Sequence, residues 1–221
     1  TQYSYAPVAG HPQLEHFSIE EDRADIIPMI RDAMAASPEG FKILASPWTA
    51  PPWMKDNNDW RGGKLLPEYY ETWALFFSKY LDAYREEGID IWGFTVENEP
   101  LGNDNNWESM HFSPKEMTDF VVNHLGPRLE EDGHEVKVLG YDQNREHLDE
   151  WVDEMFRDEA ATRYFDGTAV HWYASTYEVF PEALQYAHQK APDKYLIQSE
   201  ACVDAEVPKW QDDPWYWSKE A

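Results

Sequence analysis

Short apolar runs alternate along the chain with longer stretches that have a helical period. The runs are rich in β-branched and aromatic residues, and their starts lie 48, 47, 31 and 27 residues apart, so each gap has room for one helix and its loops. This alternation predicts repeated strand–helix units around a parallel sheet. The five predicted strands span residues 41–46, 89–96, 136–141, 167–173 and 194–199.

The clearest predicted helix precedes the second strand. Six apolar residues recur there at spacings of three and four, which places them on one face, and Gly88 follows where the helix is expected to end. We interpret this face as core packing and not as an aromatic ligand site. Its residues are Tyr70, Trp73, Phe77, Tyr80, Leu81 and Tyr84.

Two capping boxes predict further helix starts. Ser113 and Glu116 flank a proline at the first helical position, which predicts a helix from there to about Leu125. Ser18 to Glu21 has the same pattern and predicts a helix that Pro28 kinks or restarts.

Helices of this length between buried strands suit either a doubly wound sheet or an eight-stranded barrel. The glycine-rich phosphate turn of dinucleotide-binding folds follows none of the five predicted strands. The sequence therefore favours an α/β fold of the (β/α)8 type, a TIM barrel.

Composition narrows the classes of function. The 221 residues are 42% apolar and 15% aromatic, which suffices for one sizeable core. Lys and Arg number 18 against 43 Asp and Glu, and the resulting net charge of −25 repels phosphate backbones and anionic lipid. We therefore expect no nucleic-acid partner, and such acidity also suits solubility in a salty setting. Cys202 is the single cysteine, so no internal disulfide forms, and no apolar run approaches the roughly 20 residues that span a bilayer.

Polar residues lie at or directly after the carboxyl end of each of the five predicted strands. Catalytic groups of barrels lie at the carboxyl ends of strands, so these side chains are expected to converge on one mouth. The strand-end segments are Pro47–Thr49, Glu97–Pro100, Asp142–Asn144, His171–Tyr173 and Glu200–Cys202.

Two carboxyl groups on separate strands suit glycoside hydrolysis, in which one protonates the leaving oxygen and the other attacks or activates water. Glu99 and Glu200 are the candidates, and Glu97 stays an alternative to Glu99 because alternate residues of a strand share a face. Tryptophan supports a sugar substrate because apolar sugar faces stack on indole, although tryptophan is also an ordinary core residue. Five of the 11 tryptophans lie near strand ends: Trp48, Trp53, Trp60, Trp107 and Trp172.

Four motifs resemble the catalytic domain of glycoside hydrolase family 30, the glucosylceramidase and endo-β-1,6-glucanase family, in the same order and at similar intervals. They are Ile43–Asn57 (ILASPWTAPPWMKDN), Phe94–Pro100 (FTVENEP), Ala169–Tyr173 (AVHWY) and Ser199–Val203 (SEACV). The resemblance implies that residues 1–221 are part of a single glycosidase barrel domain and contain about strands three to seven. The family's first two strands, its last strand and its side β-sandwich are then absent from this chain.

The resemblance also implies roles for single residues. Glu99 matches the acid/base of the family's Asn-Glu-Pro motif, and Glu200 matches the nucleophile of its Ser-Glu-Ala-Cys motif. Asn98 matches the asparagine that hydrogen-bonds the sugar 2-hydroxyl. Trp48 looks like the tryptophan that walls the sugar subsite.

Three further residues come from the same motifs. His171 and Tyr173 resemble the pair that supports the nucleophile and the pocket, and a structural hydrogen-bonded histidine is an equally good interpretation of His171. Cys202 shares a strand face with Glu200 and either lines the pocket or is a small buried hydrophobic residue.

The resemblance implies a retaining double displacement with the two carboxyl groups roughly 5 Å apart and with no metal or organic cofactor. The expected substrate is a β-linked glucan or glucoside, with glucosylceramide among the candidates. An export signal ahead of the chain would make the protein secreted or periplasmic, and the sequence leaves the oligomeric state open.

Two other functions stay open. A metal-dependent barrel hydrolase or isomerase would use acidic side chains and one histidine to ring a divalent ion. A non-catalytic carbohydrate-binding barrel would keep the fold without the reaction. The donor set of the metal enzyme would be Glu97, Glu99, Asp142, His171 and Glu200.

Overall fold

A computed structural model describes residues 2–102, 104–175 and 178–202, and it confirms all five predicted strands. The strands form one parallel sheet in chain order, each pairing with the next along the chain. They are β1 (Leu44–Ala45), β2 (Gly93–Thr95), β3 (Lys137–Asn144), β4 (Gly167–His171) and β5 (Tyr195–Gln198).

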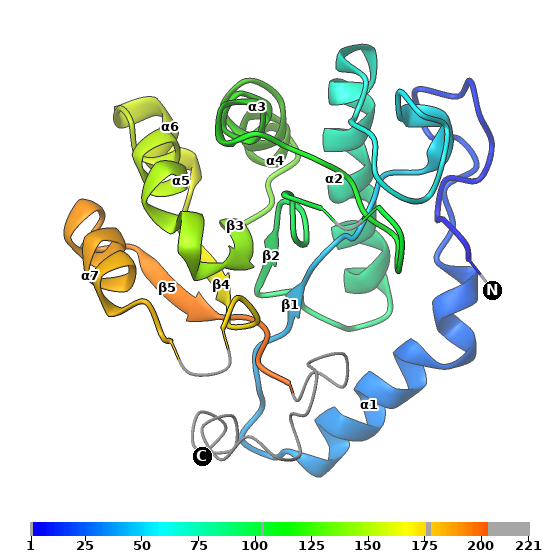
Figure 1. Ribbon diagram of the computed structural model, residues 1–221. Coiled ribbons are helices and arrows are strands. Elements are labelled where there is room, and N and C mark those ends of the chain that lie inside the picture. The colour runs from blue at the N-terminus through cyan, green and yellow to red at the C-terminus, as the bar shows by residue number, and fades with distance from the viewer. Residues whose placement is uncertain (1, 103, 176–177, 203–221) are drawn as a thin grey trace.

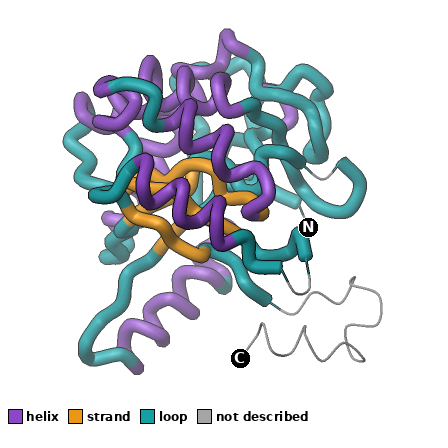
Figure 2. The backbone as a smooth tube through the Cα atoms, turned by 60° about the vertical axis from the view of Figure 1, so that its left-hand side comes forward, coloured by secondary structure: helices purple, strands orange, loops and turns teal. Residues whose placement is uncertain are grey.

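Helices connect the strands and form an arc around them, as in a barrel of which five strands are present (Figure 1). Figure 2 shows the same arrangement from another side. Within the described ranges, none of the helices has the length and apolar character needed to cross a bilayer. The helices are α1 (Ile26–Ala36), α2 (Tyr70–Glu86), α3 (Pro114–Phe120), α4 (Gly126–Glu131), α5 (Leu148–Met155), α6 (Glu159–Tyr164) and α7 (Pro181–Lys190). Short 3-10 turns span Glu20–Ala24, Pro52–Met54, Pro67–Tyr69 and Arg145–His147.

The main core lies between the sheet and the helices that cover it. The predicted apolar face of α2 packs on β2, where the rings of Phe77 and Phe94 lie 4.7 Å apart and Trp73 is fully buried. Burial of each such side chain stabilises the fold by about 2 kcal/mol. The helix ends at Glu86, and Gly88 follows the end as predicted, with a left-handed φ of 76°.

The capping box before α3 is confirmed. The Ser113 hydroxyl accepts a hydrogen bond from the Glu116 amide (3.2 Å), and the Ser113 amide donates to the Glu116 carboxyl (2.8 Å). The helix does not end at Leu125 but continues through a π-helical turn, Val121–Leu125, into α4. Pro127 has no N–H for an α-helical bond, and the wider turn carries the chain past it.

The prediction of a helix start from the second capping box was wrong. The Ser18 hydroxyl accepts from the Glu20 amide (3.2 Å), which starts a 3-10 turn in place of an α-helix. The restart that was expected near Pro28 occurs at Ile26, whose amide donates to the Asp25 carboxyl (2.7 Å). Pro28 then lies in the first turn of α1, where its missing N–H is tolerated.

Candidate active site

The segment after β2 carries three of the predicted polar residues. Glu99 has a left-handed φ of 47°, a conformation that costs a residue with a Cβ about 1–2 kcal/mol. Backbone bonds hold this turn, since the Asn98 amide donates to the Pro47 carbonyl (2.8 Å) and the Glu99 amide to the Asp142 carbonyl (2.9 Å). The strained turn is thus anchored on both neighbouring strands, β1 and β3.

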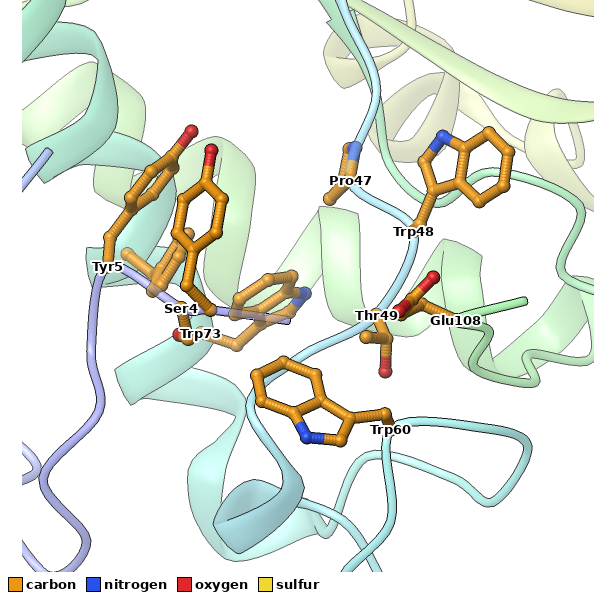
Figure 3. Close-up of a pocket in the computed structure, with 10 residues that line it drawn as sticks. Ser4, Tyr5, Pro47, Trp48, Thr49, Trp60, Trp73 and Glu108 are labelled. Carbon is orange, nitrogen blue, oxygen red and sulfur yellow. The ribbon is translucent and has the colours of Figure 1, made fainter. Parts of the chain in front are cut away.

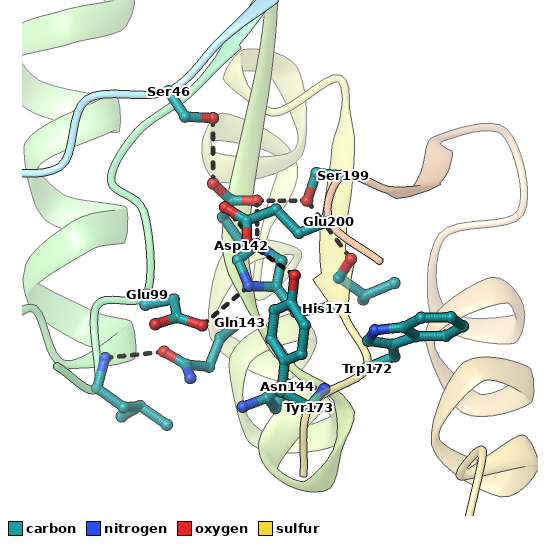
Figure 4. Close-up of polar contacts among 12 residues, drawn as sticks. Ser46, Glu99, Asp142, Gln143, Asn144, His171, Trp172, Tyr173, Ser199 and Glu200 are labelled. Carbon is teal, nitrogen blue, oxygen red and sulfur yellow. Dashed lines mark hydrogen bonds and ion pairs between the residues drawn. The ribbon is translucent and has the colours of Figure 1, made fainter. Parts of the chain in front are cut away.

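His171, at the end of β4, lies between the predicted catalytic carboxyl groups (Figure 4). Its Nδ1 is 3.0 Å from a Glu99 oxygen, and its Nε2 is 3.9 Å from a Glu200 oxygen. Nε2 also bonds Asp142 (3.1 Å). Burial lowers the pKa of His171, but the bonds to Asp142 and Glu99 outweigh it and raise this pKa to about 9. The ring is therefore a buried cation at neutral pH.

Asp142 is a site residue that the motifs did not assign. Its side chain is 1% exposed and accepts hydrogen bonds from the hydroxyls of Thr95 (2.7 Å), Ser46 (3.3 Å) and Ser199 (2.5 Å). Together with His171 these donors come from β2, β4 and the segments after β1 and β5, so one carboxyl links all five strand ends.

The backbone of β3 explains how Asp142 reaches this position. Tyr141 and Asp142 have left-handed φ values of 72° and 52°, and the register with β4 shifts between Tyr141 and Gln143. A bulge of this kind redirects a side chain at the rim of a sheet. In the sequence, Asp142 was recognisable only as a polar residue at a strand end. The residues around it do not predict the bulge that redirects its side chain.

Glu200 follows β5 and keeps 34% of its side chain exposed. Burial raises the pKa of its carboxyl above the ordinary value, and His171 and the Tyr173 hydroxyl, which donates to Glu200 (3.2 Å), offset only part of this rise. The same hydroxyl lies 3.2 Å from the Cys202 sulfur. Cys202 is exposed, so its interpretation as a small buried residue was wrong. Val203, the last residue of this motif, lies outside the described residues.

Two tryptophan rings, from the loops after β1 and after β2, pack against each other. The ring centroids of Trp48 and Trp107 lie 6.3 Å apart in an edge-to-face arrangement, and Trp48 is 40% exposed. Trp48 and Trp60 also line a cavity of about 410 Å³ beside β1, together with Tyr5 and Glu108 (Figure 3). The catalytic carboxyl candidates do not line this cavity, which is separate from the His171 cluster.

The remaining tryptophans and Asn98 have defined surroundings. The Trp53 indole donates to the Ala6 carbonyl (2.9 Å) and packs on Tyr69, so it is part of the core. The Trp172 indole donates to the Cys202 carbonyl (3.3 Å). Asn98 is 3% exposed, and its side-chain oxygen has no hydrogen-bond partner among the described residues.

The structure separates Glu99 from Glu97, which the strand pattern alone could not do. Glu97 is fully buried, neither carboxyl oxygen has a hydrogen-bond partner in the described part of the chain, and burial raises its pKa well above the ordinary value. Glu99 contacts His171 and is 15% exposed. Of these two residues, Glu99 is therefore the one that is hydrogen-bonded to His171.

Four of the five residues of the donor set considered for a metal enzyme come together, because Glu99, Asp142 and Glu200 all face His171. Within the ranges that the structure describes, no three His, Cys, Asp or Glu side chains are placed to hold a metal ion. Both ring nitrogens of His171 instead face carboxyl groups.

Comparison with known proteins places this geometry in context. A model of the glycosyl hydrolase family 30 TIM-barrel domain matches residues 1–217. Lysosomal acid glucosylceramidase of Mus musculus is 37% identical over 210 residues, which cover 91% of this chain and 41% of that protein. The chain thus spans about two fifths of the length of this curated relative.

Two solved structures share the fold at similar identity. SrfJ from Salmonella typhimurium has a TM-score of 0.86 at 35% identity, over 99% of this chain and 48% of its own. The endo-β1,6-glucanase BT3312 has a TM-score of 0.82 at 32% identity, over 92% of this chain and 45% of its own. Both support the interpretation of the five strands as part of a barrel.

Proposed function

The chain belongs to glycosyl hydrolase family 30, and on this premise we propose that its protein is a retaining β-glycosidase acting on β-glucosidic bonds. The observation that carries the proposal is the contact of one imidazole, His171, with the carboxyl groups of both Glu99 and Glu200. A pair of carboxyl groups held close together is what double displacement at a sugar carbon requires.

In the first step, the ionised Glu200 carboxyl attacks the anomeric carbon and forms an ester bond as the glycosidic C–O bond breaks. Glu99 gives its proton to the departing oxygen. The His171 cation and the Tyr173 hydroxyl favour the ionised form of Glu200 against the burial that raises its pKa.

In the second step, Glu99 acts as the base. It takes a proton from a water molecule, whose oxygen bonds to the anomeric carbon while the ester bond to Glu200 breaks. Two inversions give net retention of configuration. Neither step needs a metal or an organic cofactor, and the two carboxyl groups are expected roughly 5 Å apart.

The proposed substrate is a β-linked glucan or glucoside. The names of the relatives support this class, since one is a glucosylceramidase and another an endo-β1,6-glucanase. Both names specify a glucosyl unit on one side of the cleaved bond. Trp48 and Trp107 offer apolar ring surface for such a unit, and the Asn98 oxygen, which has no hydrogen-bond partner among the described residues, is the proposed acceptor for its 2-hydroxyl.

We also propose that residues 1–221 are the central part of one barrel domain, completed by strands outside this chain. The chain covers less than half of each solved relative, and β1 and β5 are edge strands of the described sheet.

Covalent trapping tests the reaction. The full-length protein is incubated with an activated 2-deoxy-2-fluoro-β-glucoside, and intact mass and peptide mapping locate the label. We expect one glucosyl adduct, on Glu200, and none in Glu200→Gln. A folded protein that binds β-glucan but gives neither adduct nor hydrolysis would instead be a carbohydrate-binding barrel. Activity that a chelator abolishes would support the metal enzyme.

A further inference from the structure

Lys55 is a buried cation that the proposed reaction does not use. It is 3% exposed, and its ammonium donates to the backbone carbonyls of Asp59 and Ser109, each at 2.8 Å. Burial of a charge costs several kcal/mol unless hydrogen bonds and opposite charge offset it. A lysine buried at such a site therefore points to a structural or functional task.

The two carbonyls belong to different loops. One loop spans residues 55–66, between β1 and α2, and the other spans residues 104–113, before α3. The loops also join through backbone bonds, from the Ser109 amide to the Trp60 carbonyl (3.1 Å) and from the His111 amide to the Gly63 carbonyl (2.8 Å). The Lys55 ammonium adds a side-chain link to these backbone bonds between the two loops.

Carboxyl groups around Lys55 oppose the effect of burial on its charge. Burial lowers the pKa of Lys55 to about 8, and Glu97 is the strongest of the carboxyl groups that oppose this, followed by Asp59, Asp56 and Asp104. At pH 7 the amine is therefore charged. Glu97 lies two residues before Glu99, so the carboxyl with the largest electrostatic effect on Lys55 belongs to the strand end that carries the proposed acid/base.

The second loop carries Trp107, which packs edge-to-face on Trp48. We propose that Lys55 is a positioning residue which, by clamping the two loops above Glu97, fixes Trp107 beside Trp48 as a stacking wall for a glucosyl unit. This inference rests on the proposed function. It assigns Lys55 an effect on substrate affinity and not on the chemical steps.

A double-mutant cycle in the full-length protein tests the assignment. Steady-state hydrolysis of a β-1,6-linked glucotriose is measured for the wild type, Lys55→Met, Trp107→Ala and the double variant. Loss of the clamp is expected to raise KM about tenfold in Lys55→Met, equivalent to about 1.4 kcal/mol, with kcat within about twofold. In the Trp107→Ala background, Lys55→Met should raise KM no further, because the wall is already gone.

Lys64→Met is the matched control. Lys64 lies in the same loop, but its side chain is 51% exposed and pairs with Glu116 on α3, so KM should stay unchanged. Lys55→Gln, whose side-chain amide still carries N–H donors, replaces Lys55→Met if the latter does not fold. Equal KM increases in both backgrounds, or a loss confined to kcat, would overturn the inference. A wild type that neither hydrolyses nor labels would overturn the proposed function itself.

Discussion

Two buried aspartates in this molecule each accept at least three hydrogen bonds, but their surroundings differ. Asp22 is 0% exposed and accepts from the hydroxyls of Tyr3 (2.6 Å), Tyr5 (2.6 Å) and Tyr84 (2.5 Å). Asp142 is 1% exposed and accepts from three hydroxyls and the His171 imidazole. Both carboxyl groups tie together segments that are distant along the chain.

The difference lies in where each network leads. The Asp22 bonds end on three phenols, and burial raises the pKa of each, so that all three stay neutral at physiological pH. The Asp142 bonds continue through His171 to Glu99 and Glu200. A buried carboxyl with a full set of hydrogen bonds therefore does not by itself indicate a functional site. Asp142 differs from Asp22 because its hydrogen bonds lead to further titratable groups and its backbone is held in a left-handed conformation.

The largest expected effect is that of Glu99→Gln. Removal of the acid/base should lower kcat/KM about 10²–10⁴-fold on substrates whose leaving group needs a proton. A substrate with an activated phenol leaving group should lose far less in the first step and accumulate the glycosyl-enzyme. Steady-state and burst kinetics on both substrates measure this. Asp22→Asn, assayed well below its melting temperature, is the control and should keep wild-type activity; equal losses on both substrates would contradict the role of Glu99.

Asp142→Asn tests the network that leads to the carboxyl pair. The asparagine side chain has one accepting oxygen where the carboxyl has two, so it loses some of the hydrogen bonds that Asp142 accepts. His171 and the strand ends are then less firmly oriented. A misplacement of about 1 Å can lower kcat/KM about 10²-fold. Kinetic measurement of the two aspartate variants side by side checks this. If Asp22→Asn lowered kcat/KM as much as Asp142→Asn, the two regions would not differ in function as argued.

His171 predicts a pH dependence of stability. Its pKa in the folded protein is raised to about 9, above the ordinary value of 6.5. The stabilisation is fully present below about pH 6.5 and is lost as the pH rises through about 9, on the order of 3 kcal/mol in total. Urea unfolding at several pH values should show this decrease in the wild type and not in His171→Gln. Parallel decreases in both proteins would assign the effect to other groups.

The smallest expected effect is that of Asp22→Asn on stability. Three phenols lose a carboxyl acceptor at a buried site, which should lower the free energy of unfolding by about 2 kcal/mol. Thermal or urea unfolding of the full-length protein measures it. Tyr186→Phe, which removes an exposed hydroxyl bonded to Asp153, is the matched control and should change stability by less than about 0.5 kcal/mol. A larger loss in the control than in Asp22→Asn would contradict the anchoring role of Asp22.

The sequence by itself determined the strands, their order and the polar strand ends. Strand and helix patterns repeat over two to four residues, so neighbours along the chain suffice to predict them, as in the apolar face of α2 and the capping box at Ser113. The Ser18 pattern failed because a 3-10 turn competes locally for the same hydroxyl. The motifs around Glu99 and Glu200 were readable for the same reason, as short contiguous segments.

Only the tertiary structure decided which of these residues act together. It placed Glu97 in the interior and Glu99 against His171, and it brought Asp142 to the five strand ends through a bulge. It also joined Lys55 to a loop 54 residues away. Contacts between residues so far apart in the sequence depend on how the strands and helices pack. The free energy of burying a charge depends on the same packing, so the residues next to it in the sequence do not predict it.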